Sequence, residues 1–413
     1  MSHTTPSSLE SLPVDVLVAF LSASDSLADL HAFIRSSPWL YKVFLASKRA
    51  ILLNVISKDA GPVIRDYVAL SLTPPLDLAQ DNHHENALDA VRKYQSLPAG
   101  SKARVGINIE QVLDITQFQR TAHFFVDLYE RTRLPLLAEY TQAAAMPFSP
   151  HERQRLYRAF VRHQVFTRLY PWHVRKSVDR WEVGGEFFGL FEAWEIEQVS
   201  VAHAFVFSLI SAMHVLRPQC CRDDYTSRSL GWTTCPHEWR YTDDLGALRC
   251  KIASLGETEA AFMWELEDHV RLRETYHIDG GVWGTIDSLD ESHHLTIKDR
   301  NQGDPEELSE ILDRRKSLYE VEKGRPRLTA GASCDEPPFG WVDAMRGLNC
   351  SRWGTSLGMC FCWGVQSPGC LKGWRLLPRW RQLGFVFWDK DRVELLYENS
   401  RFRPGWLGES FQP

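Results

Sequence analysis

Hydrophobic side chains recur at every third or fourth position in three short runs near the start of the chain. The runs contain Val14, Leu17, Val18 and Leu21, then Leu27, Leu30, Phe33 and Ile34, and finally Trp39, Leu40, Val43 and Phe44. This spacing places the apolar residues of each run on one face of a helix. Pro13 and Pro38 suit a first helical turn, where the missing N–H has no partner, and Ser26 suits an N-cap. The pattern predicts three helices over residues 9–47.

These three helices are too short to be stable alone. Helices of about 10 residues are marginal in water, and in proteins they are stabilised mainly by packing of their apolar face. We therefore expect them to pack on one another, on a larger domain or on a partner protein. Residues 1–8 are polar and predict a disordered tail.

The helical pattern continues over residues 48–216. Breaks are expected at Gly61-Pro62, at Thr73-Pro74-Pro75 and between Pro147 and Pro150, because glycine and proline interrupt helices. Between the breaks, the spacing predicts long helices over about 107–133 and 151–170, and two more within 187–216. Strand-type alternation is nearly absent. The sequence therefore predicts a mostly α-helical protein, with a three-helix N-terminal unit followed by a body of helix pairs packed as a bundle or array.

The periodicity is weaker in the second half of the chain. Residues 217–338 predict a mixed region of helix and loop, with a charged helix over 305–323 and a linker rich in glycine and proline over 324–338. Residues 339–413 are dense in tryptophan and cysteine and predict an irregular C-terminal section. Within it, we expect the cluster Phe385-Val386-Phe387-Trp388 to anchor a core, as large aromatic residues usually do.

Composition and charge narrow the classes of partner. Apolar residues make up 44% of the chain, so a substantial core is expected. The net charge of −6 argues against a dedicated nucleic-acid binder. The uncharged stretch 198–216 is expected to be a buried core helix rather than a membrane span. The polar first residues give no sign of a secretory signal, so we expect the nine cysteines to be reduced thiols in the cytosol or nucleus.

The sequence carries none of the common catalytic signatures, such as GxGxxG after a strand, GxxxxGK[ST], HExxH or GxSxG. We therefore expect neither an enzyme nor a bound cofactor. Two groups of residues have the chemistry of a structural zinc site, namely Cys350, Cys360, Cys362 and Cys370, and Cys220, Cys221, Cys235 and His237. Neither has paired CxxC knuckles, so ordinary structural thiols are favoured over zinc.

Basic residues gather in the predicted helix over 151–170, and acidic residues follow it. Arg155, Arg158 and Arg162 share one helical face, and six acidic residues lie between 178 and 198. One interpretation is a basic groove for an acidic or phosphorylated ligand. The other, which we favour, is two neighbouring helices with complementary solvated faces.

The N-terminal motif resembles a known family. The residues Leu12-Pro13-Val14-Asp15-Val16-Leu17, with Leu21, Leu27, Leu30, Ser36-Ser37-Pro38-Trp39 and Phe44, closely resemble an F-box, in the fungal version that runs on into residues 48–52. The rest of the chain is similar to the large, mostly helical fungal F-box-like proteins. Two later stretches fit this resemblance: residues 155–168 with 187–188 and 194–197, and residues 383–389.

The resemblance implies an adaptor role rather than catalysis. F-box helices bind a small adaptor protein that joins them to a cullin-type ubiquitin ligase, and the rest of the chain selects a protein substrate. Carried over to this sequence, the residues at or near the adaptor contact would be Leu12, Pro13, Val16, Leu17 and Leu21, whereas Leu30 and Trp39 would hold the three helices together. The alternative is a self-contained helical scaffold whose F-box-like segment is purely structural. The sequence contains no leucine-rich repeats or propeller blades, so it does not identify the substrate.

Overall fold

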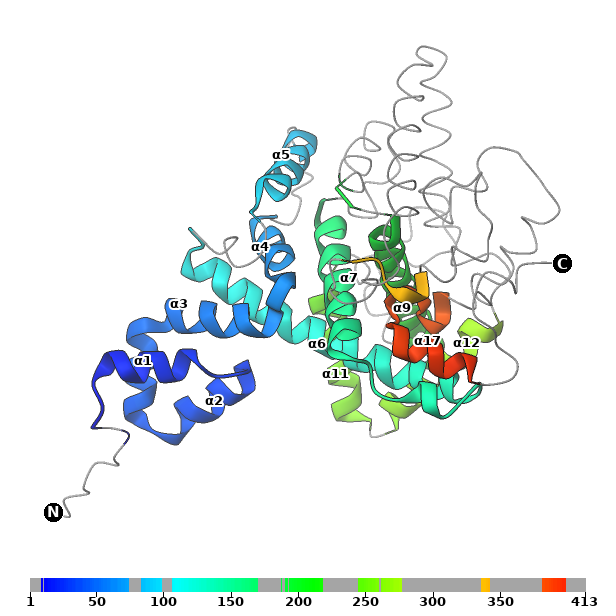
Figure 1. Ribbon diagram of the computed structural model, residues 1–413, viewed down its shortest axis with the longest axis horizontal. Coiled ribbons are helices and arrows are strands. Elements are labelled where there is room, and N and C mark those ends of the chain that lie inside the picture. The colour runs from blue at the N-terminus through cyan, green and yellow to red at the C-terminus, as the bar shows by residue number, and fades with distance from the viewer. Residues whose placement is uncertain are drawn as a thin grey trace, which may run out of the picture. The chain divides into compact units, whose positions relative to one another are not determined.

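The computed structural model describes residues 9, 11–73, 83–98, 106–169, 187, 190–191, 193–217, 244–259, 261–276, 336–341 and 381–398. This part of the chain is mostly α-helical and contains no strand, as the sequence predicted (Figure 1). It divides into two compact units. Unit 1 comprises Met1–Pro74 and Arg92–Arg120, and unit 2 comprises Pro75–Val91 and Thr121–Pro413.

Unit 1 begins with the three predicted helices. Helices α1 (Val14–Ser22) and α2 (Leu27–Ser36) both pack on α3 (Pro38–Ala60). The expected local signals are present: the Ser26 hydroxyl accepts a hydrogen bond from the Asp29 N–H at 3.1 Å, and Pro38 occupies the first turn of α3. The side chains that meet between the helices are almost fully buried, namely Leu17, Leu21, Leu30, Leu40, Val43 and Phe44.

Helix α3 is longer than the sequence predicted. It runs for 23 residues, with non-helical backbone angles at Ser47, the residue where we expected the three-helix segment to end. Beyond this kink α3 contributes Ile51, Val55 and Ile56 to the core of unit 1. The segment 9–47 is therefore joined to the rest of unit 1 by a kinked helix, not by a loop.

The remainder of unit 1 follows the predicted breaks. Gly61, with a φ of +52°, ends α3 and begins the 3-10 helix η1 (Gly61–Val63), and α4 (Ile64–Leu72) ends just before Pro74. The last residues of α5 (His83–Ser96), from Arg92 on, belong to unit 1. They are tied to α4 because the Tyr94 hydroxyl donates a hydrogen bond to the buried Asp66 carboxylate. The Arg49 side chain donates to the Ile107 carbonyl at 2.6 Å, which fixes the start of α6 (Ile109–Ala138) against α3.

Unit 2 contains the second half of α6, then η3 (Ala143–Ala145), α7 (Pro150–Leu169), α9 (Ala193–Leu216), α11 (Leu245–Thr258) and α12 (Phe262–Tyr276). Helix α9 packs on both α7 and α12. The chain returns to this body near its end through η7 (Phe385–Phe387) and α17 (Lys390–Tyr397). The aromatic cluster 385–388 is fully buried, as predicted.

The uncharged stretch 198–216 lies within α9. Among the described helices, α9 alone is long and apolar enough to cross a membrane, over Trp194–Met213, and 78% of this window is buried inside the structure. The predicted buried core helix is thus observed.

Candidate functional site

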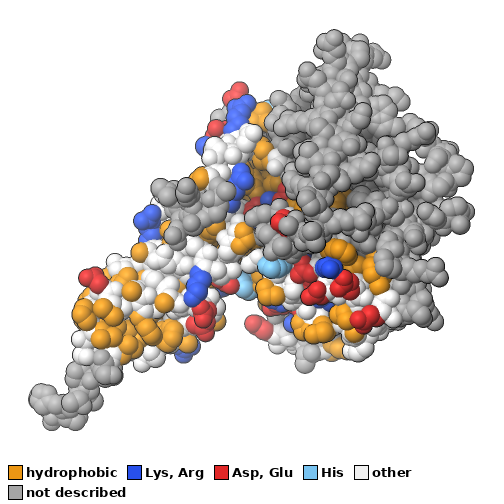
Figure 2. All heavy atoms as spheres, viewed as in Figure 1, with side chains coloured by type: hydrophobic (Ala, Val, Ile, Leu, Met, Phe, Trp, Pro, Cys, Tyr) orange, Lys and Arg blue, Asp and Glu red, His pale blue; other side chains and the backbone are white. Residues whose placement is uncertain are grey.

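Large hydrophobic side chains remain exposed at the start of unit 1. Leu12 is 38% exposed, and Val14 and Val16 are each 47% exposed. Pro13 lies between them and is also exposed. We call these four residues the docking surface. Figure 2 shows hydrophobic side chains gathered over the region of α1 and α2. Exposed hydrophobic residues that lie this close together in the sequence are candidates for contact with another protein.

The five residues assigned to the adaptor contact divide between surface and interior. Leu12, Pro13 and Val16 are exposed, whereas Leu17 and Leu21 are completely buried. Successive helical residues are turned by about 100°, so Val16 and Leu17 face in different directions. Leu17 and Leu21 therefore do not reach the surface in this fold. They belong to the core of unit 1 rather than to the predicted contact surface.

Trp39 also departs from the sequence interpretation. It was expected to hold the three helices together, but its side chain is 40% exposed, whereas Leu30 is buried as expected. Tyr41 and Leu45, which stand one helical turn apart on α3, are exposed as well. Sequence reasoning missed both. No local signal separated them, because adjacent residues of the same helix, such as Val43 and Phe44, are both buried.

Exposed hydrophobic residues are concentrated in unit 1. In the described part of the chain, eight of the eleven large hydrophobic residues that are exposed belong to unit 1, namely Leu12, Val14, Val16, Trp39, Tyr41, Leu45, Ile109 and Leu113. The other three, Met146, Val215 and Trp264, belong to unit 2. Single exposed hydrophobic residues are common, but such a bias toward the smaller unit distinguishes its surface from that of the body.

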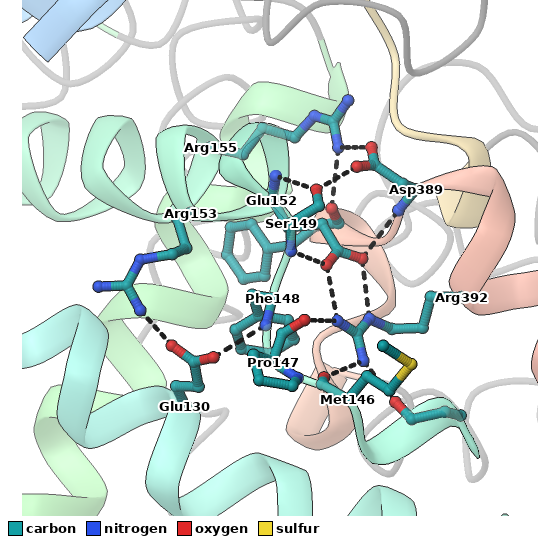
Figure 3. Close-up of polar contacts among 12 residues, drawn as sticks. Glu130, Met146, Pro147, Phe148, Ser149, Glu152, Arg153, Arg155, Asp389 and Arg392 are labelled. Atoms are coloured by element: carbon teal, nitrogen blue, oxygen red, sulfur yellow. Dashed lines mark hydrogen bonds and ion pairs between the residues drawn. The ribbon is translucent and has the colours of Figure 1, made fainter.

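A buried polar network occupies the start of α7 in unit 2 (Figure 3). Ser149 and Glu152 cap the helix reciprocally, since the Glu152 N–H donates to the Ser149 hydroxyl at 3.1 Å and the Ser149 N–H donates to the Glu152 carboxylate at 2.8 Å. The same carboxylate accepts two hydrogen bonds from Arg392 at 2.8 Å and one from the Asp389 N–H at 3.0 Å. Glu152 therefore joins the helix cap to the C-terminal residues.

Arg155 extends this network, and Arg381 forms a further buried ion pair. The completely buried Arg155 donates to Asp389 at 2.6 Å and to the Phe387 carbonyl at 2.9 Å. Arg381 donates to the buried Glu197 of α9 at 3.0 Å. The remaining three N–H groups of Arg392 donate to the carbonyls of Ala144, Met146 and Pro147, the last two at 2.9 and 3.0 Å. These contacts give the buried charges the partners that burial requires.

The basic face of α7 is neither a ligand groove nor a solvated face. Arg155, Arg158 and Arg162 are all buried. Arg162 forms an ion pair with Glu195 at 2.7 Å, and its guanidinium lies 4.2 Å from the centre of the Phe191 ring. The ligand-groove interpretation is therefore wrong, and the favoured one holds in part. Arg158 and Arg162 do pair with Glu195 of the neighbouring helix α9, but these faces are buried rather than solvated. The three residues do share one helical face, and pairing with Glu195 and with Asp389 allows that face to point inward.

Arg153 projects from the same helix toward α6. It forms ion pairs with Asp127 and Glu130, and Glu130 in turn accepts a hydrogen bond from the Phe148 N–H at 2.8 Å. Burial by itself lowers the pKa of Arg153, but the hydrogen bond to Asp127 and the neighbouring Tyr157 and Glu130 outweigh it and hold this pKa above its ordinary value. The guanidinium therefore remains charged and keeps the loop before α7 against α6.

The chemistry of these groups is structural. The network carboxylates are occupied by arginines and backbone N–H groups, which leaves them poorly placed to take a proton from a substrate. The buried His163 and His203 form a ring-to-ring contact, with Nε2 and Nδ1 3.0 Å apart, that joins α7 to α9.

The described residues include no group of three or more His, Cys, Asp or Glu side chains that could hold a metal ion. Both sets considered for zinc, Cys350, Cys360, Cys362 and Cys370 and the set Cys220, Cys221, Cys235 and His237, lie outside the described residues. So do the predicted helix over 305–323 and the linker over 324–338. The cysteine within the described residues is Cys250, which is exposed on α11.

Comparisons of this chain with protein-family models, with curated proteins and with solved structures found no match.

Proposed function

We propose that this protein is an F-box-type substrate receptor of a cullin-type ubiquitin ligase. In this role the docking surface of unit 1 binds the small adaptor protein of the ligase, and the helical body of unit 2 binds a protein target. The receptor itself needs no catalytic residues, and it acts in the cytoplasm or nucleus. The observation that supports the proposal is the exposure of Leu12, Val14 and Val16 beside a fully packed interior.

The packing explains how these residues can remain exposed. Leu17, Leu21 and Leu30 hold α1 and α2 on α3, so the fold of the segment does not depend on burying Leu12 or Val16. Hydrophobic side chains on such a preformed surface are well suited to act as anchors in a protein interface, because little conformational ordering opposes binding.

Co-purification with the adaptor tests the proposal. The full chain with Leu12→Asp and Val16→Asp is compared with the wild type and with a Val215→Asp control, because Val215 in unit 2 is as exposed as Val16. We expect the wild type and the control to retain the adaptor and the double variant to lose it, with all three chains melting at similar temperatures. Equal recovery from all three, or none from the wild type, would reject the proposal.

One feature favours the alternative of a self-contained helical scaffold. Helix α3 passes through Ser47 into the rest of unit 1, so the three-helix segment is part of a larger packed unit. If the segment is purely structural, the wild type will not retain the adaptor.

A further inference from the structure

The C-terminal segment, residues 381–398, completes the core of unit 2 from far along the chain. Phe385, Val386, Phe387 and Trp388 are fully buried. Their backbone is held by side chains of the body, since Arg155 donates to the Phe387 carbonyl and Gln198 donates to the Val386 carbonyl, both at 2.9 Å. Three ion pairs flank this aromatic stretch, namely Arg381 with Glu197, Asp389 with Arg155, and Arg392 with Glu152.

The charges of these pairs alternate along both partners. The C-terminal segment reads positive, negative, positive at Arg381, Asp389 and Arg392. Its partners in the body are negative, positive and negative, namely Glu197, Arg155 and Glu152. They follow one another in the opposite direction of the chain.

Two of the pairs have a reciprocal form. Glu152 stands three residues before Arg155, and Asp389 stands three residues before Arg392. The two acid-x-x-Arg patterns meet crosswise, so that each acid faces the arginine of the other pattern (Figure 3). Docking in the opposite direction would place acid against acid and arginine against arginine.

Stability alone does not account for this arrangement. The hydrophobic effect favours burial of the aromatic stretch but is not directional, so it does not select one register or one orientation. Buried ion pairs often contribute little net stability compared with hydrophobic residues of the same size, because desolvation opposes their attraction. A misplaced segment, however, would leave several buried charges unpaired, which is strongly unfavourable.

We infer that the three ion pairs act as a register code, which fixes the position and the direction in which the C-terminal segment docks on α7 and α9. The aromatic residues supply the free energy of docking, and the charges exclude competing placements. This role does not depend on the proposed receptor function.

The test uses the full chain labelled with 5-fluorotryptophan, with the Trp388 resonance assigned by Trp388→Phe. A variant with Glu152→Met, Arg155→Met, Asp389→Leu and Arg392→Met removes the crosswise pairs but keeps the site apolar. We expect the wild type to show one Trp388 resonance, and this variant to show several or a broadened one while its helical content is retained. A single resonance at the wild-type position would overturn the inference.

Charge exchange decides the matter if that variant does not fold. Exchange on one side of the third pair, with Arg381→Glu, places like charges against each other at Glu197 and should abolish the wild-type Trp388 resonance. Adding Glu197→Arg restores this ion pair and should restore a single resonance. A one-sided exchange that leaves the Trp388 resonance unchanged, or a two-sided exchange that fails to restore a single resonance, would also overturn the inference.

Discussion

The buried and the exposed hydrophobic residues at the start of unit 1 should respond differently to truncation to alanine. Leu17→Ala removes a completely buried side chain, and such a change typically lowers the free energy of unfolding by about 2–5 kcal/mol. For a unit of this size, a loss of about 2 kcal/mol lowers the melting temperature by roughly 10 °C. The docking surface of the folded fraction would be unchanged, so adaptor affinity should stay close to that of the wild type.

Leu12→Ala combined with Val16→Ala should instead weaken binding and leave stability almost unchanged. Each carbon removed from water contributes about 0.8 kcal/mol, so full burial of the three lost from Leu12 and the two lost from Val16 is worth about 2.4 and 1.6 kcal/mol. These side chains are already partly covered, with 38% and 47% exposed, so about 0.9 and 0.8 kcal/mol remain for a partner to gain. The sum of about 1.7 kcal/mol corresponds to a loss of affinity of roughly 20-fold.

Calorimetric titration of purified adaptor into each folded variant, with thermal melts of the same samples, measures both quantities. The assignment of faces is wrong if the double variant binds within twofold of the wild type. It is equally wrong if Leu17→Ala weakens binding as much as the double variant does, at a temperature where both chains are folded.

Three further predictions concern stability. Gly384→Ala should lower the melting temperature, because Gly384 has a φ of +87° and an added Cβ would lie 2.5 Å from the Tyr129 hydroxyl. A thermal melt equal to that of the wild type would contradict this prediction. Arg392→Met should lower the free energy of unfolding, measured in urea, by about 3–5 kcal/mol, because it leaves the Glu152 carboxylate buried without its guanidinium partner. As a control, Lys390→Met removes an exposed charge of the same helix and should change the free energy of unfolding little. Ser26→Ala should cost about 1 kcal/mol by removing the N-cap of α2, and Ser26→Asn should restore most of it.

Local signals in the sequence predicted the helices well. Ser26, Pro38, Gly61-Pro62 and Thr73-Pro74 act on their own backbone, so their effect on helix ends can be read without knowing the rest of the fold. The same holds for the stretch 198–216 of α9, whose length and lack of charge predicted a buried helix.

The burial of polar residues could not be read in this way. Arg155 is completely buried because Asp389, more than two hundred residues later, pairs with it, and no local pattern reveals that partner. The docking surface posed a similar problem. The sequence of α1 contains apolar residues on more than one face, and only the packing of α3 shows that Leu17 turns inward and Val16 outward. Periodicity identifies candidate faces, but the choice between them depends on the partner helix.

The late position of the C-terminal segment has a consequence during protein synthesis. All residues of unit 1 precede Thr121, so this unit can fold while more than two hundred residues are still to be translated. Unit 2, in contrast, lacks part of its core until Trp388 has left the ribosome. A premature stop codon between the two points would yield a chain with an intact docking surface and an incomplete body. If the proposed function holds, such a product would occupy the adaptor without delivering a target, and so act as a dominant inhibitor of the full-length receptor.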